Sequence, residues 1–277
     1  MGPRFGYFLS CEEFGPEDLV AQAVKAEAAG FDCLWISDHF HPWNDEQGQS
    51  PFVWSVIGAL SQACSLPVTT AVTCPTVRMN PAIVAQAAAT CAVMLDGRFT
   101  LGVGTGEALN EHILGDAWPT VDIRLEMLEE AVALIRRLWT GEFVSHRGSH
   151  YRVDTARIYT LPDEPPPIFM SGFGPQAVDV AARIADGYIT TSPDTAMLER
   201  FRDRSGGKPL RPAPRLHGPR QRRRDWRSPT ACGAPAASPE SWPRCCRHRA
   251  TSNRLRSWSP SSRPVTRSPV ARTPSST

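Results

Sequence analysis

The 277 residues carry 30 Lys and Arg against 28 Asp and Glu, and 41% are hydrophobic, as in an ordinary globular protein. At roughly 150 residues per domain, this length fits one large domain or two ordinary ones. No stretch approaches the ~20 apolar residues of a membrane span, and residues 1–5 do not begin a signal peptide. We therefore expect a cytoplasmic protein with no membrane partner. The cysteines form no C-x-x-C pair, so neither a disulfide scaffold nor a metal site is expected.

The charge is distributed unevenly along the chain. Residues 1–205 hold 14 Lys and Arg against 26 Asp and Glu, a net charge of −12, whereas residues 206–277 hold 16 against 2, a net charge of +14. The last 72 residues also contain 12 of the 26 prolines and no Ile, Phe, Tyr or Met. Such a segment cannot bury enough apolar surface to offset the entropy of ordering it. The sequence predicts a folded domain over residues 1–208 and a disordered basic tail over 209–277.

Strand and helix patterns alternate through the folded domain. An apolar run at residues 4–9 predicts the first strand, and residues 16–29, with apolar side chains at helical spacing, predict the first helix. The alternation continues with strands at 33–37, 68–72, 99–104, 168–171 and 188–191 and helices at 53–63, 81–94, 124–139 and 176–184. Strands separated by amphipathic helices indicate parallel βαβ units. Six such units predict an α/β protein of the TIM (β/α)8-barrel type, whose active site lies at the carboxyl ends of the strands.

Polar and glycine-rich segments follow the predicted strands, where that active site would lie. His39 follows the second strand and Glu107 the fourth, and imidazoles and carboxylates are the usual general acid–base groups. Structural interpretations compete with these: His39 alone is as readily a structural residue, Asp38 an N-cap, and Trp43 a packing aromatic. The Gly-x-Gly turn at residues 104–106 lacks the third glycine of a dinucleotide-binding motif, so the pattern alone does not establish phosphate binding.

Three segments together resemble one family. They are residues 37–43 (SDHFHPW), 74–81 (CPTVRMNP) and 101–111 (LGVGTGEALNE), and the third is long enough to be specific to a subgroup. They are similar to coenzyme F420-dependent glucose-6-phosphate dehydrogenases and their close relatives, in the luciferase-like superfamily of flavin and deazaflavin oxidoreductases. The resemblance runs from about Arg4 to Lys208. It implies a TIM barrel with the deazaflavin ring lying across the strand ends, and a homodimer.

The resemblance also implies roles for individual residues. His39 and Glu107 would be the catalytic acid–base pair, one acting on the substrate hydroxyl and the other on the deazaflavin ring, and the sequence does not decide which does which. A non-proline cis peptide bond would join Ala71 to Val72 behind the ring. Backbone amides at the helix start after the fifth strand would face the cofactor phosphate. The implied cofactor-binding residues are Asp38, Ala71, Val72, Cys74, Thr105, Gly106, Asn110, Phe173, Gly174, Gln176 and Ala177.

At the substrate end the sequence departs from the family. The resemblance implies that Trp43 and Thr191 bind substrate, but the glucose-6-phosphate dehydrogenases carry a phosphate-binding lysine where this sequence has Asp194. An aspartate repels a phosphate dianion, so we expect hydride transfer between F420 and a different alcohol or sugar-like substrate. The response to glucose 6-phosphate should be weaker by about tenfold or more. The alternative is an FMN-dependent monooxygenase of the same superfamily, which cofactor affinity would distinguish.

The basic tail admits two interpretations beyond an ordinary solvated segment. Arginines at 220 and 222–224 would suit nucleic acid or a membrane surface. The tail is also rich in Arg, Pro, Ser and Ala, which GC-rich codons produce when read out of phase, and compatible codons for residues 251–261 encode an amphipathic helix in another phase. We therefore interpret it as frameshifted near residues 208–211, which resequencing would test, and expect no nucleic-acid partner.

The frameshift interpretation has a structural consequence for the barrel. Only about six βα units would remain where a closed barrel needs eight. The strand at residues 188–191 would then be left with an unpaired edge beside the active site. The alternative function is accordingly an inactive truncated fragment with a basic tail.

Overall fold

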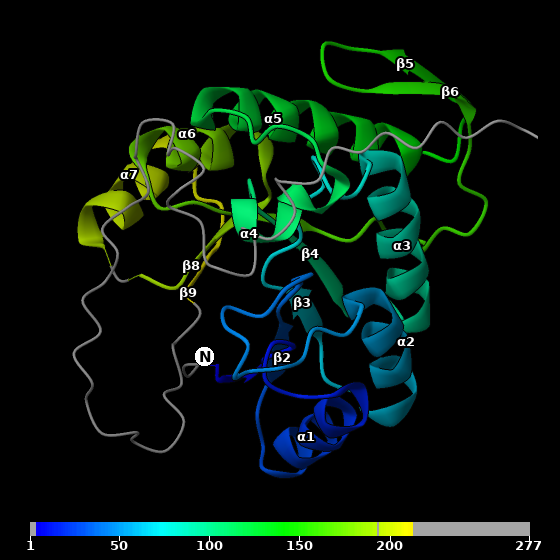
Figure 1. Ribbon diagram of the computed structural model, residues 1–277, viewed down its shortest axis with the longest axis vertical. Helices are drawn as coiled ribbons and strands as arrows, with labels where there is room; N and C mark the ends of the chain where they lie inside the picture. The colour runs from blue at the N-terminus through cyan, green and yellow to red at the C-terminus, as the bar shows by residue number, and fades with distance from the viewer. Residues whose placement is uncertain (1–3, 193, 213–277) are drawn as a thin grey trace, which may run out of the picture. The chain divides into compact units, whose positions relative to one another are not determined.

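A seven-stranded parallel sheet forms the centre of the computed structural model, which describes residues 4–192 and 194–212 (Figure 1). Its order, β1-β2-β3-β4-β7-β8-β9, follows the chain, and every neighbouring pair is parallel. The strands are β1 (Gly6–Leu9), β2 (Cys33–Ile36), β3 (Val68–Thr70), β4 (Phe99–Val103), β7 (Ile168–Ser171), β8 (Gly187–Thr190) and β9 (Leu210–Pro212). Within the described residues the sheet remains open between β1 and β9. The predicted α/β fold of the TIM-barrel type is confirmed.

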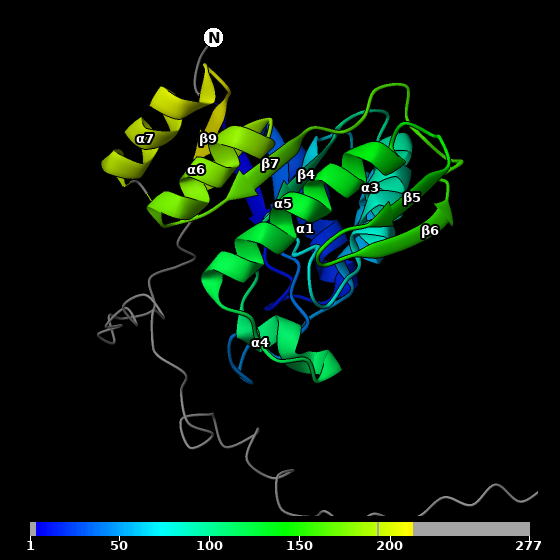
Figure 2. The same cartoon turned by 90° about the horizontal axis from the view of Figure 1, so that it is seen from above.

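Helices cover the outside of this sheet in an arc (Figures 1 and 2). They are α1 (Pro16–Ala28), α2 (Val53–Ala63), α3 (Pro81–Met94), α5 (Val121–Leu138), α6 (Pro175–Ile184) and α7 (Thr195–Ser205). Local sequence fixes where they begin: Asn80 caps α3 by accepting from the amide of Ala82, and proline occupies the first turns of α1, α3 and α6. In the described part of the chain, no helix is both long and apolar enough to cross a membrane.

The hydrophobic core lies mainly between the helices and the outer face of the sheet. Leu19 of α1, Leu60 of α2 and Leu128 of α5 are fully buried there. Burial of each such side chain contributes about 1.5–3 kcal/mol. A much smaller cluster fills the inner face of the sheet, where Trp35 and Phe169 pack with Ile189. The rigid outer core therefore holds the strand ends in place, and those ends carry the site.

An antiparallel hairpin, β5 (Val144–Arg147) and β6 (Arg152–Ala156), lies apart from the sheet. Glu130 of α5 anchors it by accepting from Nε2 of His146 at 2.8 Å and from the amides of His150 at 3.0 Å and Tyr151 at 2.9 Å. The Tyr151 hydroxyl donates to the carbonyl of Thr76 at 3.2 Å. The hairpin is thus attached to the segment that follows β3.

The six predicted strands and five predicted helices are all present, with ends shifted by a few residues. The sequence pattern does not predict the hairpin, the short helices α4 (Ala108–Glu111) and η1 (His112–Leu114), α7 or β9. The expected unpaired edge at β8 is wrong, because Tyr188, Ile189 and Thr190 pair in parallel with β9. Strand β9 has only two residues, Leu210 and Arg211, between two prolines, and such a segment gives no strand pattern. The proposed frameshifted tail lies outside the described residues from position 213 onward, and the boundary at 208 stays a prediction.

Candidate active site

A cavity of about 300 Å³ opens at the carboxyl ends of β4 and β7. Its walls come from the end of β3, from the Gly-x-Gly turn after β4, from the turn after β7 and from the starts of α5 and α6. The residues around it are Val72, Gly104, Thr105, Gly106, Glu107, Val121, Ser171, Gly172, Phe173, Gly174, Pro175, Gln176 and Ala177. Eight of the predicted site residues therefore meet around one cavity.

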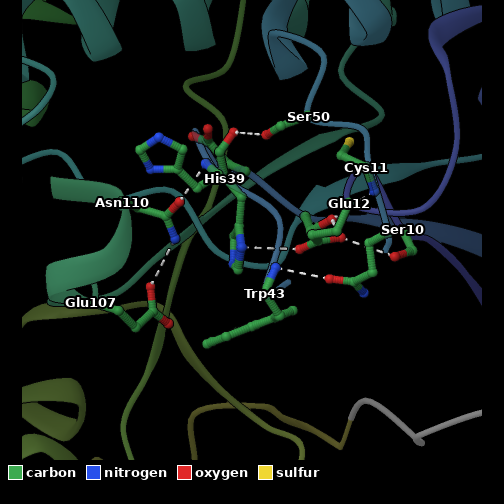
Figure 3. A network of polar contacts seen from close by, with 12 residues as sticks. Ser10, Cys11, Glu12, His39, Trp43, Ser50, Glu107 and Asn110 are labelled. Atoms are coloured by element: carbon green, nitrogen blue, oxygen red, sulfur yellow. Dashed lines mark hydrogen bonds and ion pairs between the residues drawn. The ribbon is translucent and has the colours of Figure 1, made fainter. Parts of the chain in front are cut away.

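His39 lies just after β2 and is held from behind by a buried carboxylate. Its Nδ1 is 3.2 Å from Oε1 of Glu12, an ionic contact that lacks the alignment of a hydrogen bond (Figure 3). Glu12 is only 4% exposed, and its Oε2 accepts from the hydroxyls of Ser10 at 2.9 Å and Ser37 at 2.7 Å. The carboxylate favours a proton on Nδ1, so that Nε2 is the nitrogen available for proton exchange.

Trp43 packs edge-on against the His39 ring, with ring centroids 5.0 Å apart. The indole is 57% exposed, and Phe40 is also exposed. An apolar surface therefore adjoins the imidazole, which is the environment that an apolar part of a substrate requires.

Glu107 is the N-cap residue of α4 and is exposed at the cavity. Oε2 of Glu107 lies 3.5 Å from the amide nitrogen of Asn110, whose Oδ1 accepts from the backbone N–H groups of Phe40 and His41. Figure 3 shows Asn110 joining Glu107 to the loop that carries His39. Asn110 thus links Glu107, which lines the cavity, to the loop of His39, which lies outside the cavity lining.

A buried network of charged groups connects three of the strand ends. Oδ1 of Asp38 accepts from Nη2 of Arg78 at 2.9 Å, and its Oδ2 accepts from the hydroxyl of Thr73 at 2.8 Å. The backbone amide of Arg78 donates to Glu111 at 2.7 Å. Burial raises the pKa of Glu111, although Arg78 opposes the shift. Asp38 is therefore a buried structural partner, and its predicted contact with a cofactor stays a prediction.

Close packing shapes the cavity wall after β3 and β4. Gly106 has φ of +72°, and a Cβ there would lie 2.6 Å from Sγ of Cys74. Cys74 is buried, and burial raises the pKa of its thiol to about 12, so it is not a nucleophile at neutral pH. The peptide bond between Ala71 and Val72 is cis, as the resemblance implied.

The start of α6 provides an anion-binding surface beside the same cavity. Gly174 is the N-cap residue and supplies no side-chain cap, and Pro175 occupies the first turn. The backbone amides of Gln176 and Ala177 therefore point out of the helix with no capping partner, and both residues line the cavity. A helix N-terminus of this kind favours a phosphate or another anion.

The predicted substrate end lies after β8 and is exposed. Thr191 does not line the cavity, and Pro193 lies outside the described residues. Asp194 is the N-cap residue of α7, where its carboxylate accepts from the amides of Ala196 at 3.0 Å and Met197 at 3.3 Å. The carboxylate of Asp194 therefore occupies the N-terminus of α7.

Sequence reasoning missed Glu12 and Arg78. Glu12 follows the first strand, so the rule that polar residues gather at strand ends applies to it as well. Arg78 lies in the segment 74–81 (CPTVRMNP), to which the resemblance gives no role for an arginine. Ala71, Cys74, Asn110, His39 and Trp43 do not line the cavity directly.

Comparisons with known proteins agree with this geometry. The model of the family "Luciferase-like monooxygenase" matches residues 3–205. The chain is 50% identical over 192 residues to a protein of Nakamurella multipartita named F420-dependent glucose-6-phosphate dehydrogenase, covering 68% of this chain and 56% of the relative. A protein of the same name from Microbacterium testaceum is 46% identical over 190 residues, with the same coverage of 68% and 56%.

A solved F420-dependent secondary alcohol dehydrogenase, in complex with an F420-acetone adduct, has a similar fold. Its TM-score is 0.70 at 39% identity, over 74% of this chain and 66% of that one. The chain spans about half the length of the curated relatives that it matches, with 56% of each covered. The family match covers most of the described residues and the whole cavity. The chain therefore belongs to the luciferase-like monooxygenase family.

Proposed function

We propose that this chain carries the cofactor site and the acid–base pair of an F420-dependent alcohol dehydrogenase. The observation that carries the proposal is the link that Asn110 makes between Glu107, which lines the cavity, and the loop that carries His39. The names of the relatives at 43–50% identity and of the solved alcohol dehydrogenase support the choice of F420.

The cavity fits a flat ring that carries a phosphate group. A Cβ on Gly104 would lie 2.7 Å from Cγ2 of Val72, and one on Gly172 would lie 2.5 Å from Cβ of Ala177, so glycine backbone forms both walls. The uncapped amides of Gln176 and Ala177 supply the anion site. Thr105 and Phe173 complete the lining. When bound, the deazaflavin supplies a carbon centre that accepts or donates a hydride.

The side chains of the site provide proton transfer and orientation. His39, with Nδ1 against Glu12, presents Nε2 to take up the proton that an alcohol loses on oxidation or to return it on reduction. Glu107, exposed at the cavity, exchanges the second proton on the cofactor side. Trp43 bounds one side of the space beside His39.

We propose an apolar or weakly polar alcohol as the substrate, in place of glucose 6-phosphate. Asp194 occupies the α7 N-terminus, and the resemblance gives its position to a phosphate-binding lysine, so its charge disfavours a phosphate dianion there. The exposed indole of Trp43 next to His39 favours apolar carbon. The names of the curated relatives point to the sugar phosphate, and assay of both substrate classes decides between them.

The test is a titration followed by an assay. We expect F420 to bind the purified chain, with quenching of its fluorescence, and excess FMN to compete poorly. Turnover of propan-2-ol with F420 should exceed turnover of glucose 6-phosphate by about tenfold or more in kcat/KM. Tight binding of FMN without binding of F420 would favour the monooxygenase. Turnover of glucose 6-phosphate at the higher rate would overturn the substrate proposal.

A further inference from the structure

We infer that Asn110 is a positioning residue that holds the His39 loop and Glu107 in one fixed frame. This role goes beyond contact with a cofactor, and its importance for catalysis rests on the proposed function. We call the hydrogen bonds of the Asn110 side chain to Phe40, His41 and Glu107 the clamp, and these bonds involve the protein alone.

The first half of the clamp is the side-chain oxygen of Asn110. Asn110 is 1% exposed, and its Oδ1 accepts from the amide of Phe40 at 2.8 Å and from the amide of His41 at 3.0 Å. These are the two peptide groups that directly follow His39 in the chain. A carbonyl oxygen has two lone pairs, so both acceptor sites of Oδ1 are occupied within the protein.

The second half is the side-chain nitrogen, which faces the other catalytic candidate. Nδ2 of Asn110 donates to Oε2 of Glu107 at 3.5 Å, a long contact. Figure 3 shows the amide group lying between the loop of His39 and the Glu107 carboxylate. The Asn110 side chain therefore contacts both the loop of His39 and Glu107. The distance between these two segments decides whether a substrate and a ring fit between them.

Other contacts join this loop and α4 to their surroundings. Glu111 of α4 is bound by the backbone and side chain of Arg78, which also binds Asp38, the residue before His39. After Asp38, Nδ1 of His41 contacts the carbonyl of Leu109 at 2.9 Å, and Ser50 donates to the carbonyl of His39. Loss of Oδ1 would leave two amides of the loop without their acceptor, and the loop would move relative to α4.

Two substitutions separate the two halves of the clamp. Asn110→Ala removes both the acceptor and the donor. Asn110→Asp keeps an oxygen for the amides of Phe40 and His41 but places a second carboxylate against Glu107. Asn80 offers a matched pair of controls, because it is an exposed N-cap residue of α3 whose Oδ1 accepts from the amide of Ala82.

Hydrogen exchange of the full chain without cofactor tests the first half. Asn110→Ala should speed exchange of the Phe40 and His41 amides by about tenfold, the effect of one lost hydrogen bond, whereas Asn110→Asp and Asn80→Ala should leave those amides at the wild-type rate. Unchanged exchange in Asn110→Ala overturns the proposal. Exchange as fast in Asn110→Asp as in Asn110→Ala overturns it too, because Oδ1 would then not be the group that matters.

The pH profile of turnover with F420 and propan-2-ol tests the second half. Asn110→Asp should move a limb of this profile to higher pH, because the new carboxylate lies against that of Glu107 and neighbouring carboxylates disfavour each other's charged forms. Asn80→Asp should leave the profile unchanged. An unshifted limb in Asn110→Asp overturns the coupling to Glu107, and it does so even where Asn110→Ala fails to fold. Loss of turnover in the wild type contradicts the proposed function alone, since hydrogen exchange still decides the clamp.

Discussion

Glu12 is the carboxylate that holds the imidazole of His39 at its Nδ1 side. The carboxylate is buried, receives two serine hydroxyls and lies 3.2 Å from Nδ1 of the imidazole. In the proposed function, this contact makes Glu12 a positioning residue for His39. The imidazole and the carboxylate come from different strand ends, β2 and β1.

Glu12→Gln is expected to lower kcat by about 10- to 100-fold, because the isosteric amide keeps an acceptor for the serines but loses the charge facing His39. Steady-state kinetics with F420 and propan-2-ol measure the effect, and thermal unfolding shows whether the fold survives. The exposed neighbour Glu13, substituted Glu13→Gln, is the control and should keep the wild-type kcat. Equal kcat in the two variants would remove Glu12 from the mechanism.

At the scale of single residues, the sequence predicts the reactive groups better than their supports. His39 and Glu107 are predicted because their chemistry and their place after a strand coincide, and their catalytic roles stay predictions. Glu12 was not, because the pairing with Ser37 and His39 joins residues 25 or more positions apart. Asn110 was assigned to the cofactor, and only the structure shows that its oxygen is occupied by backbone amides.

Among the elements, the contact between β7 and α6 sets the width of the cavity. The turn at Gly172 passes so close to the first turn of α6 that an added Cβ would lie 2.5 Å from Cβ of Ala177. Neither atom belongs to a flexible side chain, so a substitution must displace the helix start and its free amides.

Gly172→Ala is therefore expected to weaken F420 binding by about tenfold or more, with a smaller loss of stability. Fluorescence titration gives the dissociation constant. Gly58→Ala serves as the control, because Gly58 lies inside α2, where the added Cβ makes an ordinary 3.8 Å contact and helix propensity favours alanine by about 1 kcal/mol. An unchanged dissociation constant in Gly172→Ala would show that the cofactor does not use the α6 start.

The β5–β6 hairpin depends on one carboxylate, and this dependence makes its attachment sensitive to pH. Burial opposes ionisation of Glu130, but the hydrogen bonds from His146 and from the amides of Tyr151 and His150 outweigh it and hold the pKa below the usual 4.5. A lowered pKa in the folded state means that the stabilisation is complete above pH 4.5 and is lost as the pH falls through the native value.

Exchange of the amides in residues 144–156 should accordingly rise below pH 4.5, after correction for intrinsic rates. Glu130→Gln should show the faster exchange already at pH 7, because the amide offers one acceptor oxygen to three donors. Glu126→Gln is the matched control, since the Glu126 side chain is 62% exposed and its Oε2 lies 3.6 Å from Nε2 of His150. A hairpin equally protected at pH 7 in the Glu130 and Glu126 variants would contradict the anchor.

Elements with strong periodicity were predictable, and elements made by tertiary contacts were not. The apolar spacing of α5 and the apolar runs of β4 and β7 identify those elements without help from the rest of the chain. The hairpin carries mostly polar, exposed residues, and its position depends on Glu130. Strand β9 has two residues between prolines and is a strand through its pairing with the edge of β8.

For the whole molecule, the sheet is open at both edges within the described residues, and the chain spans 56% of the Nakamurella multipartita relative. Within the described residues, β1 and β9 each have one neighbour, and each exposes backbone N–H and C=O groups along the other edge. The inner cluster of Trp35, Phe169 and Ile189 is small. Phe8 and Val72, which pack against this cluster, are only partly buried. A closed barrel would cover both edges and this inner face.

A chimera tests whether closure is what the described part of the molecule needs. Residues 213–277 would be replaced by the segment that follows the matched region in the Nakamurella multipartita relative, of which this chain covers 56%. The chimera is expected to unfold at a temperature higher by about 4 °C or more, as 1–2 kcal/mol of added stability would give, and to bind F420 more tightly. Calorimetry and fluorescence titration measure both against the original chain. Equal unfolding midpoints and equal F420 dissociation constants in the chimera and the original chain would contradict this expectation. The open sheet would then already provide the full stability and cofactor affinity, because the added strands would cover no surface on which these two properties depend.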